Sequence, residues 1–266
     1  MPIKYCAILP HSPILIPEIG QSNRVILQKT LDSYEKVGQE LREKEIDNII
    51  VFTPHGPVQE AVFLCQSGLE MGLGTREISY IGSRKKVSSD LSLSQAICEA
   101  AREQFTIYQT TPEMLDYGSS IPLALLLDET FNPRVTVINK ADGLSLADQY
   151  RFGQQVAQTL ENSPRHCAVI ASADLSHRLK RNSPGGYSPK GAKFDNKLIE
   201  YLSDNQNGPA QILAMDQNLV RDAKSCGIKS IASALGAIAH RCYEPQVLSY
   251  QTELGVGYLS FVFKLI

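Results

Sequence analysis

Hydrophobic residues recur along this chain in two alternating patterns. Short apolar runs, rich in β-branched residues, end at proline or at a polar turn, which is the pattern of buried strands. Longer segments place apolar residues at every third or fourth position, which predicts helices. The predicted strands are Lys4–Leu9, Asn48–Phe52, Ala61–Gln66, Arg134–Asn139, Cys167–Ser172, Gln246–Tyr250 and Gly257–Leu265. The predicted helices are Ser22–Lys44, Ser89–Gln104, Ile121–Glu129, Ser145–Asn162, Gly191–Asp204 and Gly227–Cys242.

The alternation of strands with helices predicts an α/β fold of three layers, with a largely parallel central sheet and helices on both faces. The chain has no internal repeat, low-complexity stretch or linker, so residues 1–266 are expected to form a single domain. Ser22 is the expected N-cap of the first long helix, and Pro122 is expected in the first turn of a later one. The apolar segment 259–266 is expected to be an inner strand; as an edge strand it would pair between subunits of a homo-oligomer.

Composition excludes several classes of protein. The 266 residues are 43% hydrophobic, and 26 basic against 28 acidic residues give a net charge of −2, so nothing favours nucleic-acid binding. Apolar runs fall far short of the ~20 residues of a membrane helix, and the N-terminus lacks a signal-peptide core, so we expect a cytoplasmic protein. The six cysteines form no CxxC pair, and most are expected to be buried small hydrophobic residues.

Three of the five histidines directly follow predicted strands. His11 stands in LPHSP, His55 in FTPHGP and His177 in ASADLSH. Functional groups of open α/β sheets gather beyond the carboxyl ends of the strands, so these imidazoles are expected to open into one cavity. His11 and His55, both bounded by prolines, are candidate ligands of one metal ion; the alternative is that they are solvent-facing loop residues.

The segment ASADLSH adds a carboxylate to this chemistry. Asp174 and His177 are three residues apart and would share a face of a helical turn, where the carboxylate would orient the imidazole. His177 is then a candidate general base. In the alternative interpretation, Asp174 caps a short helix and His177 lines a pocket passively. The following loop, with Gly185, Gly186 and Tyr187, is either a flexible lid or a surface loop.

Several blocks together resemble one family. These are AILPHSPILIPEIG, TPHGP, LDYGSSIPLALL, IASADLSHRL, PGGY, GAKFD, CGIKSIASALGA and VLSY…GVGYL, in the family's order from residue 7 to residue 259. They resemble the class III extradiol ring-cleaving dioxygenases, the LigB-like family, and within it the Memo-like proteins of the AmmeMemoRadiSam group. The resemblance implies a mononuclear metal in a strand-end pocket, with His11 and His55 as ligands and His177 as the acid/base residue.

Two positions depart from the ring-cleaving pattern. Related domains carry a glutamate ligand where this chain has Ser225, and the resemblance to Memo-like proteins points to Cys226 as the third ligand. Because Cys226 precedes a predicted helix, its thiol pKa is expected to be lowered, and a thiolate allows Fe(II), Cu or Zn. Tyr117 replaces a histidine that helps to handle dioxygen, and it is a poor base near neutral pH.

Three functions remain open from the sequence. The first is a metal-dependent oxidoreductase, most simply with Fe(II), that cleaves a small aromatic diol with O2, using His177, Asp174 and Tyr117 at the reacting centre. The second is a Memo-like protein that binds a metal or a peptide, without ring cleavage. The third is a hydrolase with zinc-bound water in the same pocket.

Overall fold

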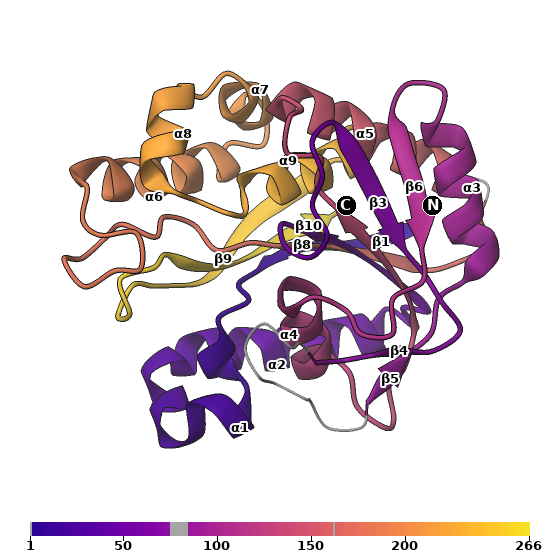
Figure 1. Ribbon diagram of the computed structural model, residues 1–266, viewed down its shortest axis with the longest axis horizontal. Coiled ribbons are helices and arrows are strands. Elements are labelled where there is room, and N and C mark those ends of the chain that lie inside the picture. Colours follow the sequence, from indigo (N-terminus) through magenta and orange to yellow (C-terminus); the bar gives the residue numbers. More distant parts are fainter. Residues whose placement is uncertain (1, 75–84, 162) are drawn as a thin grey trace.

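The computed structural model describes residues 2–74, 85–161 and 163–266 (Figure 1). Its strands are β1 (Ile3–Leu9), β2 (Asn48–Thr53), β3 (Val62–Gln66), β4 (Met71–Gly72), β5 (Lys86–Val87), β6 (Thr106–Thr110), β7 (Arg134–Asn139), β8 (Cys167–Ser172), β9 (Tyr243–Gln251) and β10 (Tyr258–Leu265). Its helices are α1 (Pro17–Gly20), α2 (Gln28–Glu43), α3 (Leu91–Ala101), α4 (Tyr117–Leu126), α5 (Leu146–Leu160), α6 (Pro189–Leu202), α7 (Gly208–Leu213), α8 (Gln217–Ala223) and α9 (Ile228–Ala237), with 3-10 segments η1 (Pro13–Leu15) and η2 (Gln21–Leu27).

Within these residues, eight strands form one sheet in the order β6-β3-β7-β2-β8-β1-β10-β9, and β4 pairs with β5 separately. The four central strands, β7, β2, β8 and β1, run parallel to their neighbours in this group. β3 pairs antiparallel with β7, and β10 pairs antiparallel with β1 and β9. The predicted fold class, a largely parallel sheet in an α/β protein, is confirmed.

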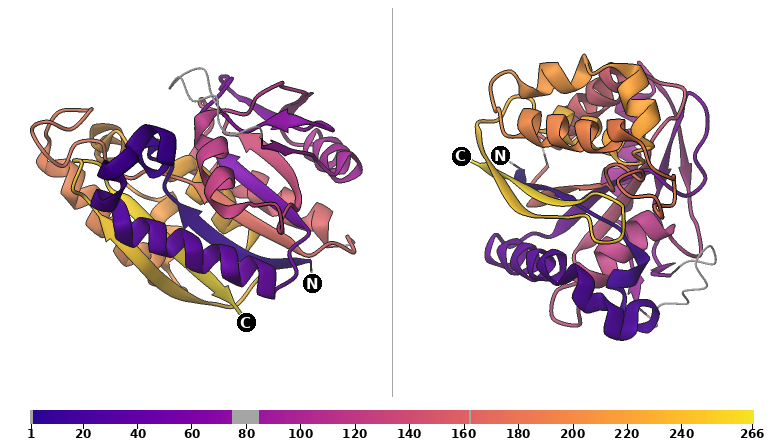
Figure 2. Two further views of the ribbon diagram at one scale, coloured as in Figure 1. Left: turned by 90° about the horizontal axis from the view of Figure 1, so that it is seen from below. Right: turned by 90° about the vertical axis from the view of Figure 1, so that its left-hand side faces the viewer.

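Helices cover both faces of this sheet (Figure 2). On one face α3, α5, α6 and α9 bury a core that includes Ile97, Phe152, Phe194 and Ile231. On the other face α2 and α4 bury a second core that includes Tyr34 and Ile121. Each such side chain contributes roughly 1.5–3 kcal/mol through its removal from water. The central strands are therefore buried on both sides, as their uninterrupted apolar runs predicted.

The first long helix begins later than predicted. Residues Gln21–Leu27 form the 3-10 segment η2, and α2 starts at Gln28, so the N-cap role expected of Ser22 is wrong. The Gln251 side chain from β9 supplies the missing acceptor, because its Oε1 takes hydrogen bonds from Thr30 N (2.9 Å) and Thr30 Oγ1 (3.0 Å). The cap thus comes from a distant strand, which local sequence does not reveal.

Other element boundaries also differ from the prediction. Strand β6 and the short helices α7 and α8 were not predicted; β6 has little apolar alternation, and helices of six or seven residues are too short to show a period. The predicted end of one helix at Asn162 lies outside the described residues. The C-terminal segment forms β10, which lies between β1 and β9 and is therefore an inner strand, as expected. Among the described residues, no helix is long and apolar enough for a membrane span.

Candidate metal centre

Three adjacent parallel strands each place a polar side chain at the same edge of the sheet. His55, Asp174 and His11 are the second residues after β2, β8 and β1, respectively. The Nε2 atoms of His11 and His55 are 3.0 Å apart, and their rings meet nearly at right angles with centroids 4.8 Å apart. Cys226 Sγ lies 3.4 Å from His11 Nε2. The ligand atoms of His11, His55 and Cys226 all lie within 4.8 Å of one another, so the structure brings the three predicted ligands together.

The orientation of His11 follows from a proline inside a helix. Helix α4 starts at Tyr117, not at Ile121 as predicted, so Pro122 lies within it and not in its first turn. Since proline has no N–H, the carbonyl of Gly118, four residues earlier, loses its helical partner. The Ser172 hydroxyl donates to this carbonyl, and Ser172 Oγ then accepts from His11 Nδ1 at 2.8 Å. His11 is therefore protonated at Nδ1, and its Nε2 presents a lone pair to the centre.

A buried network fixes His55 through its backbone. The Asn139 side chain at the end of β7 donates to the His55 carbonyl, and the His55 amide donates to Thr53 Oγ1 at 3.3 Å. Thr53 Oγ1 donates in turn to Asp116 Oδ1 at 2.8 Å. Asp116 also caps helix α4, which is why the helix starts where it does. One carboxylate thus positions both His55 and the start of α4.

Tyr117 is the first residue of α4 and covers the face of the His55 imidazole. The two rings are stacked, with centroids 4.1 Å apart and an interplanar angle of 29°. The phenol oxygen lies 3.0 Å from Nδ1 and 2.8 Å from Nε2 of His55. The structure thus places the Tyr117 hydroxyl next to both ring nitrogens of His55.

Cys226 is held by close packing between two loops. The Gly227 amide donates to the Asp174 carbonyl at 3.2 Å, and the Ser225 hydroxyl donates to the same carbonyl at 3.1 Å. A Cβ added to Gly227 would lie 2.3 Å from the Cβ of Ala173, so only glycine permits this approach. The expected lowering of the Cys226 pKa is wrong. Burial and the Asp174 carboxylate raise the pKa of its thiol well above the ordinary value, which outweighs the adjacent helix N-terminus.

The Asp174 carboxylate is hydrogen-bonded to the His11 backbone amide, and not to His177 as predicted. Residues 173–176 form no helical turn, so the predicted shared face with His177 is wrong. Asp174 Oδ1 accepts from the backbone amide of His11 at 3.0 Å, and Oδ2 lies 3.7 Å from His11 Nε2. Burial raises the pKa of the Asp174 carboxyl to about 6, against the lowering effects of His177 and of the His11 amide. Asp174 therefore adds a fourth donor atom beside the three predicted ligands.

His177 lies next to this group on a loop fixed at several points. Its Nδ1 is 3.2 Å from the Leu175 carbonyl, which leaves Nε2 as the nitrogen that can accept a proton. The His177 amide donates to Ala223 O, and its carbonyl accepts from Gly185 N at 2.9 Å. Ser183 Oγ donates to Gly255 O at 2.7 Å. The loop that contains Gly185 and Gly186 is therefore hydrogen-bonded to the His177 backbone and, through Ser183, to the β9–β10 turn.

The donor set suits a metal ion. Burial, together with the nearby charge of His177, lowers the pKa of His11 to about 3, so its contact with Asp174 is no ion pair. Burial, His11, Lys140 and His177 lower the pKa of His55 to about 2. An ion with imidazole nitrogens at ~2.0–2.2 Å and a thiolate at ~2.3 Å holds such donors roughly 3–3.6 Å apart. The two separations from His11 Nε2, 3.0 and 3.4 Å, fall in that range, whereas the three donor atoms together span up to 4.8 Å, so the third pair would have to close on binding.

Sequence reasoning missed the residues that support the ligands. Ser172 and Asn139 are the last residues of β8 and β7, and Lys140 follows directly. All three stand at the edge where His11 and His55 were expected. Their position at strand ends was a signal that could have found them, because parallel strands bring those ends together.

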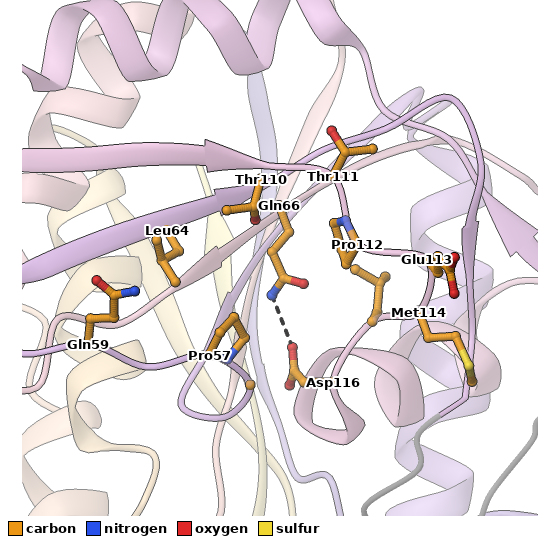
Figure 3. A pocket seen from close by; sticks show the side chains of 12 residues that line it. Pro57, Gln59, Leu64, Gln66, Thr110, Thr111, Pro112, Glu113, Met114 and Asp116 are labelled. Carbon is orange, nitrogen blue, oxygen red and sulfur yellow. Dashed lines mark hydrogen bonds between the residues drawn. The ribbon is translucent and has the colours of Figure 1, made fainter.

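Figure 3 shows the side chains that line a cavity of about 690 Å³. Its wall includes Gly56 and Asp116, the chain neighbours of His55 and Tyr117. Gln66, also in the wall, donates to Asp116 Oδ2 at 3.4 Å and to Asn139 Oδ1 at 2.6 Å. The cavity wall and the support of His55 therefore belong to one hydrogen-bond network.

Comparison with known proteins identifies the relatives of this chain. The family model described as the catalytic LigB subunit of aromatic ring-opening dioxygenase matches residues 5–261. Protein CA_C1420 of Clostridium acetobutylicum is 30% identical over 262 residues, 94% of this chain but 55% of that protein, so the chain spans about half of that relative. The 3,4-dihydroxyphenylacetate 2,3-dioxygenase of Escherichia coli is 23% identical over 203 residues, 73% of this chain and 74% of that enzyme. The crystal structure of protein JW3007 from Escherichia coli K12 shares the fold, with a TM-score of 0.71, 15% identity, and coverage of 98% and 99% of the two chains.

Proposed function

The chain belongs to the LigB family of aromatic ring-opening dioxygenases, and on this premise we propose that it is a metal-dependent oxidoreductase acting on a catechol-like diol with O2. Fe(II) is the proposed metal, with Cu or Zn as alternatives. His11, His55 and Cys226 are its proposed ligands. The six cysteines are free thiols, which accords with a reducing, cytoplasmic location.

The observation that carries this proposal is the convergence of three donor atoms with defined roles. Ser172 holds His11 in the tautomer whose Nε2 is a Lewis base, and this atom lies within 3.4 Å of both other ligand residues. The Nε2 atoms of His11 and His55, 3.0 Å apart, would share either the Nε2 proton of His55 or a bound cation. When bound, such an ion would supply Lewis-acid and redox chemistry toward a diol and O2.

The remaining residues have roles that their contacts support. His177 donates from Nδ1 to Leu175 O, so its Nε2 would take the proton of a substrate hydroxyl. Asp174 holds the backbone of His11 through the hydrogen bond that its Oδ1 accepts from the His11 amide. Tyr117 would place its hydroxyl beside the ligand nitrogens as a hydrogen-bond donor to bound substrate.

A second function rests on the nature of the third ligand. A thiolate at Cys226 is oxidisable and softer than the carboxylate of ring-cleaving relatives, and Tyr117 is a poor base. Both features favour a Memo-like metal-binding protein with a redox or partner-binding role. This function needs the same metal centre but no turnover of a diol.

Oxygen uptake separates the two functions. Protein purified without oxygen would be analysed for bound metal, loaded with Fe(II), and mixed with a panel of catechols in air-saturated buffer. We expect one equivalent of metal and uptake of one O2 for each catechol consumed, with a ring-opened product. A metal-loaded protein that turns over no diol in the panel would exclude the enzyme and leave the metal-binding function.

A further inference from the structure

The cavity in Figure 3 is separate from the proposed metal ligands. Within the described residues, its wall contains none of those ligands and does not include His177. The wall is built from the turn after β2, from β3, and from the segment that joins β6 to α4. A volume of about 690 Å³ is typical of sites for small organic molecules. The cavity is therefore large enough for a ligand of its own.

The wall is acidic. Within the described part of the chain, its lining includes two acidic residues, Glu113 and Asp116, and no basic one. Asp116 is only 6% exposed, and the described donors to its carboxylate are all neutral: Thr53 Oγ1, the Ser119 amide and hydroxyl, and Gln66 Nε2. Burial raises the pKa of this carboxyl against the lowering effect of these bonds. A cationic ligand would supply the opposite charge that a buried carboxylate needs.

Gln66 presents a hydrogen-bond acceptor to the same cavity. Its side chain is 1% exposed and extends into the middle of the lining residues (Figure 3). Its Nε2 donates to Asp116 and to Asn139, whereas its Oε1 accepts no hydrogen bond from any described residue. The Thr110 hydroxyl, in the same wall, is also buried without a partner among the described residues. Buried polar atoms are normally paired, so these oxygens favour a ligand that donates hydrogen bonds.

The remaining wall favours a ligand with an apolar body. Five of the lining residues are apolar: Pro57, Leu64, Pro112, Met114 and Leu115. An ammonium group has three N–H donors and no acceptor, so it matches both the carboxylate and the free amide oxygen. A primary amine on a short hydrocarbon chain or ring therefore combines the charge, the donors and the apolar surface that this wall requires.

We propose that the cavity is a second ligand site, which binds a small primary ammonium compound with an apolar body, its charged group next to Asp116 and Gln66 Oε1. This site goes beyond the proposed function, because it involves neither the metal ion nor a diol. It assigns to Asp116 a role in ligand binding besides its cap of α4.

Binding affinities would test the site directly. Isothermal titration of the purified full-length chain would compare 2-phenylethylamine with 2-phenylethanol, in which a hydroxyl replaces the ammonium group. Neither compound is an aromatic diol, so ring cleavage plays no part. We expect the amine to bind roughly 10-fold or more tightly, as a charge-assisted hydrogen bond allows. Asp116→Asn keeps a good N-cap for α4 and should bring the affinity ratio of the two compounds close to one.

Two further variants keep the test decisive. Thr111→Trp would fill the cavity from an exposed position in its wall and should abolish binding of both compounds. Glu244→Gln removes a remote surface carboxylate paired with Lys264 and should leave the ratio at its wild-type value.

Three results would overturn the proposal. These are equal or undetectable binding of the two compounds by the wild type, a preference for the amine that persists in Asp116→Asn, and unchanged binding in Thr111→Trp. Absence of catechol turnover would bear on the proposed function alone, because within the described residues no proposed metal ligand lines the cavity.

Discussion

Replacing Ser172 by alanine removes the group that fixes the tautomer of His11. The wild-type hydroxyl is fully buried, accepts from His11 Nδ1 at 2.8 Å and donates to the carbonyl that Pro122 leaves without a helical partner. In Ser172→Ala the imidazole has no partner at Nδ1, so the proton is no longer held on that nitrogen. Loss of such a hydrogen bond behind a ligand typically lowers metal affinity 10–100-fold, about 1.4–2.8 kcal/mol.

The variant should also lose stability without metal, because a buried donor and a buried acceptor are left unpaired. This penalty is on the order of 1–3 kcal/mol. Ser94→Ala is the matched control, since Ser94 is equally buried and bonds the Thr136 hydroxyl at 3.0 Å, remote from the centre. It should lose similar stability but keep the wild-type metal affinity.

Two measurements separate the change in metal affinity from the change in stability. Competition with a chromophoric chelator gives metal affinity, and urea unfolding of the metal-free proteins gives the free energy of unfolding. Ser172→Ala with unchanged metal affinity would refute the assignment of His11 Nε2 as a ligand held by Ser172. An equal loss of metal affinity in Ser94→Ala would show that the effect is general destabilisation.

Three further predictions follow from individual contacts. His177→Ala should retain metal, because Nε2 is assigned to proton transfer, and should lower turnover roughly 10²–10⁴-fold; loss of metal by elemental analysis would make it a ligand instead. Gly118→Ala should destabilise the fold by roughly 1–3 kcal/mol and weaken metal binding, because the new methyl would lie 2.6 Å from Thr53 Oγ1 and 3.0 Å from His55 Cδ2; the control Gly38→Ala meets the flexible Arg42 guanidinium at 3.2 Å and the Leu126 carbonyl at an ordinary 3.8 Å, and should do neither. Burial raises the pKa of the Asp195 carboxyl to about 6, so its ionisation destabilises the folded state as pH rises from about 4 to above 6; the free energy of unfolding of the wild type, from urea titrations, should fall by up to about 3 kcal/mol relative to Asp195→Asn over that range, and parallel pH curves would contradict this.

The positions of His11 and His55 were predictable because each follows an apolar run, and parallel strands bring their carboxyl ends together. The resemblance to a family pattern also pointed to Cys226, whose thiol the structure places near both imidazoles. The partner of Asp174 was not predictable, since the segment after β8 is shaped by residues distant in sequence. Leu175 N donates to Gly257 O, and Gly257 N donates to Ser176 O, which keeps this segment from forming a helical turn.

The predicted first residues of α2 and α4 were also wrong. Local propensity favoured Pro122 in a first turn, but the Asp116 cap starts α4 a turn earlier, because Thr53 and Gln66 also bind that carboxylate. The N-terminus of α2 likewise depends on Gln251. The acceptor at the start of α2 lies 221 positions away in the sequence, and local periodicity carries no information about such a pair, whereas the Asp116 cap bonds Ser119 only three residues on and was a local signal that the prediction missed.

The proposed centre binds one metal ion through two imidazoles and the Cys226 thiolate. X-ray absorption at the iron edge of anaerobic Fe(II)-loaded protein reports the atoms bound to that ion. We expect one sulfur neighbour at about 2.3 Å together with imidazole nitrogens, and loss of the sulfur signal in Cys226→Ser but not in Cys242→Ser, whose thiol is exposed. A wild-type spectrum with only nitrogen and oxygen neighbours would rule out Cys226 as a ligand and point to Asp174, whose Oδ2 lies 3.7 Å from His11 Nε2.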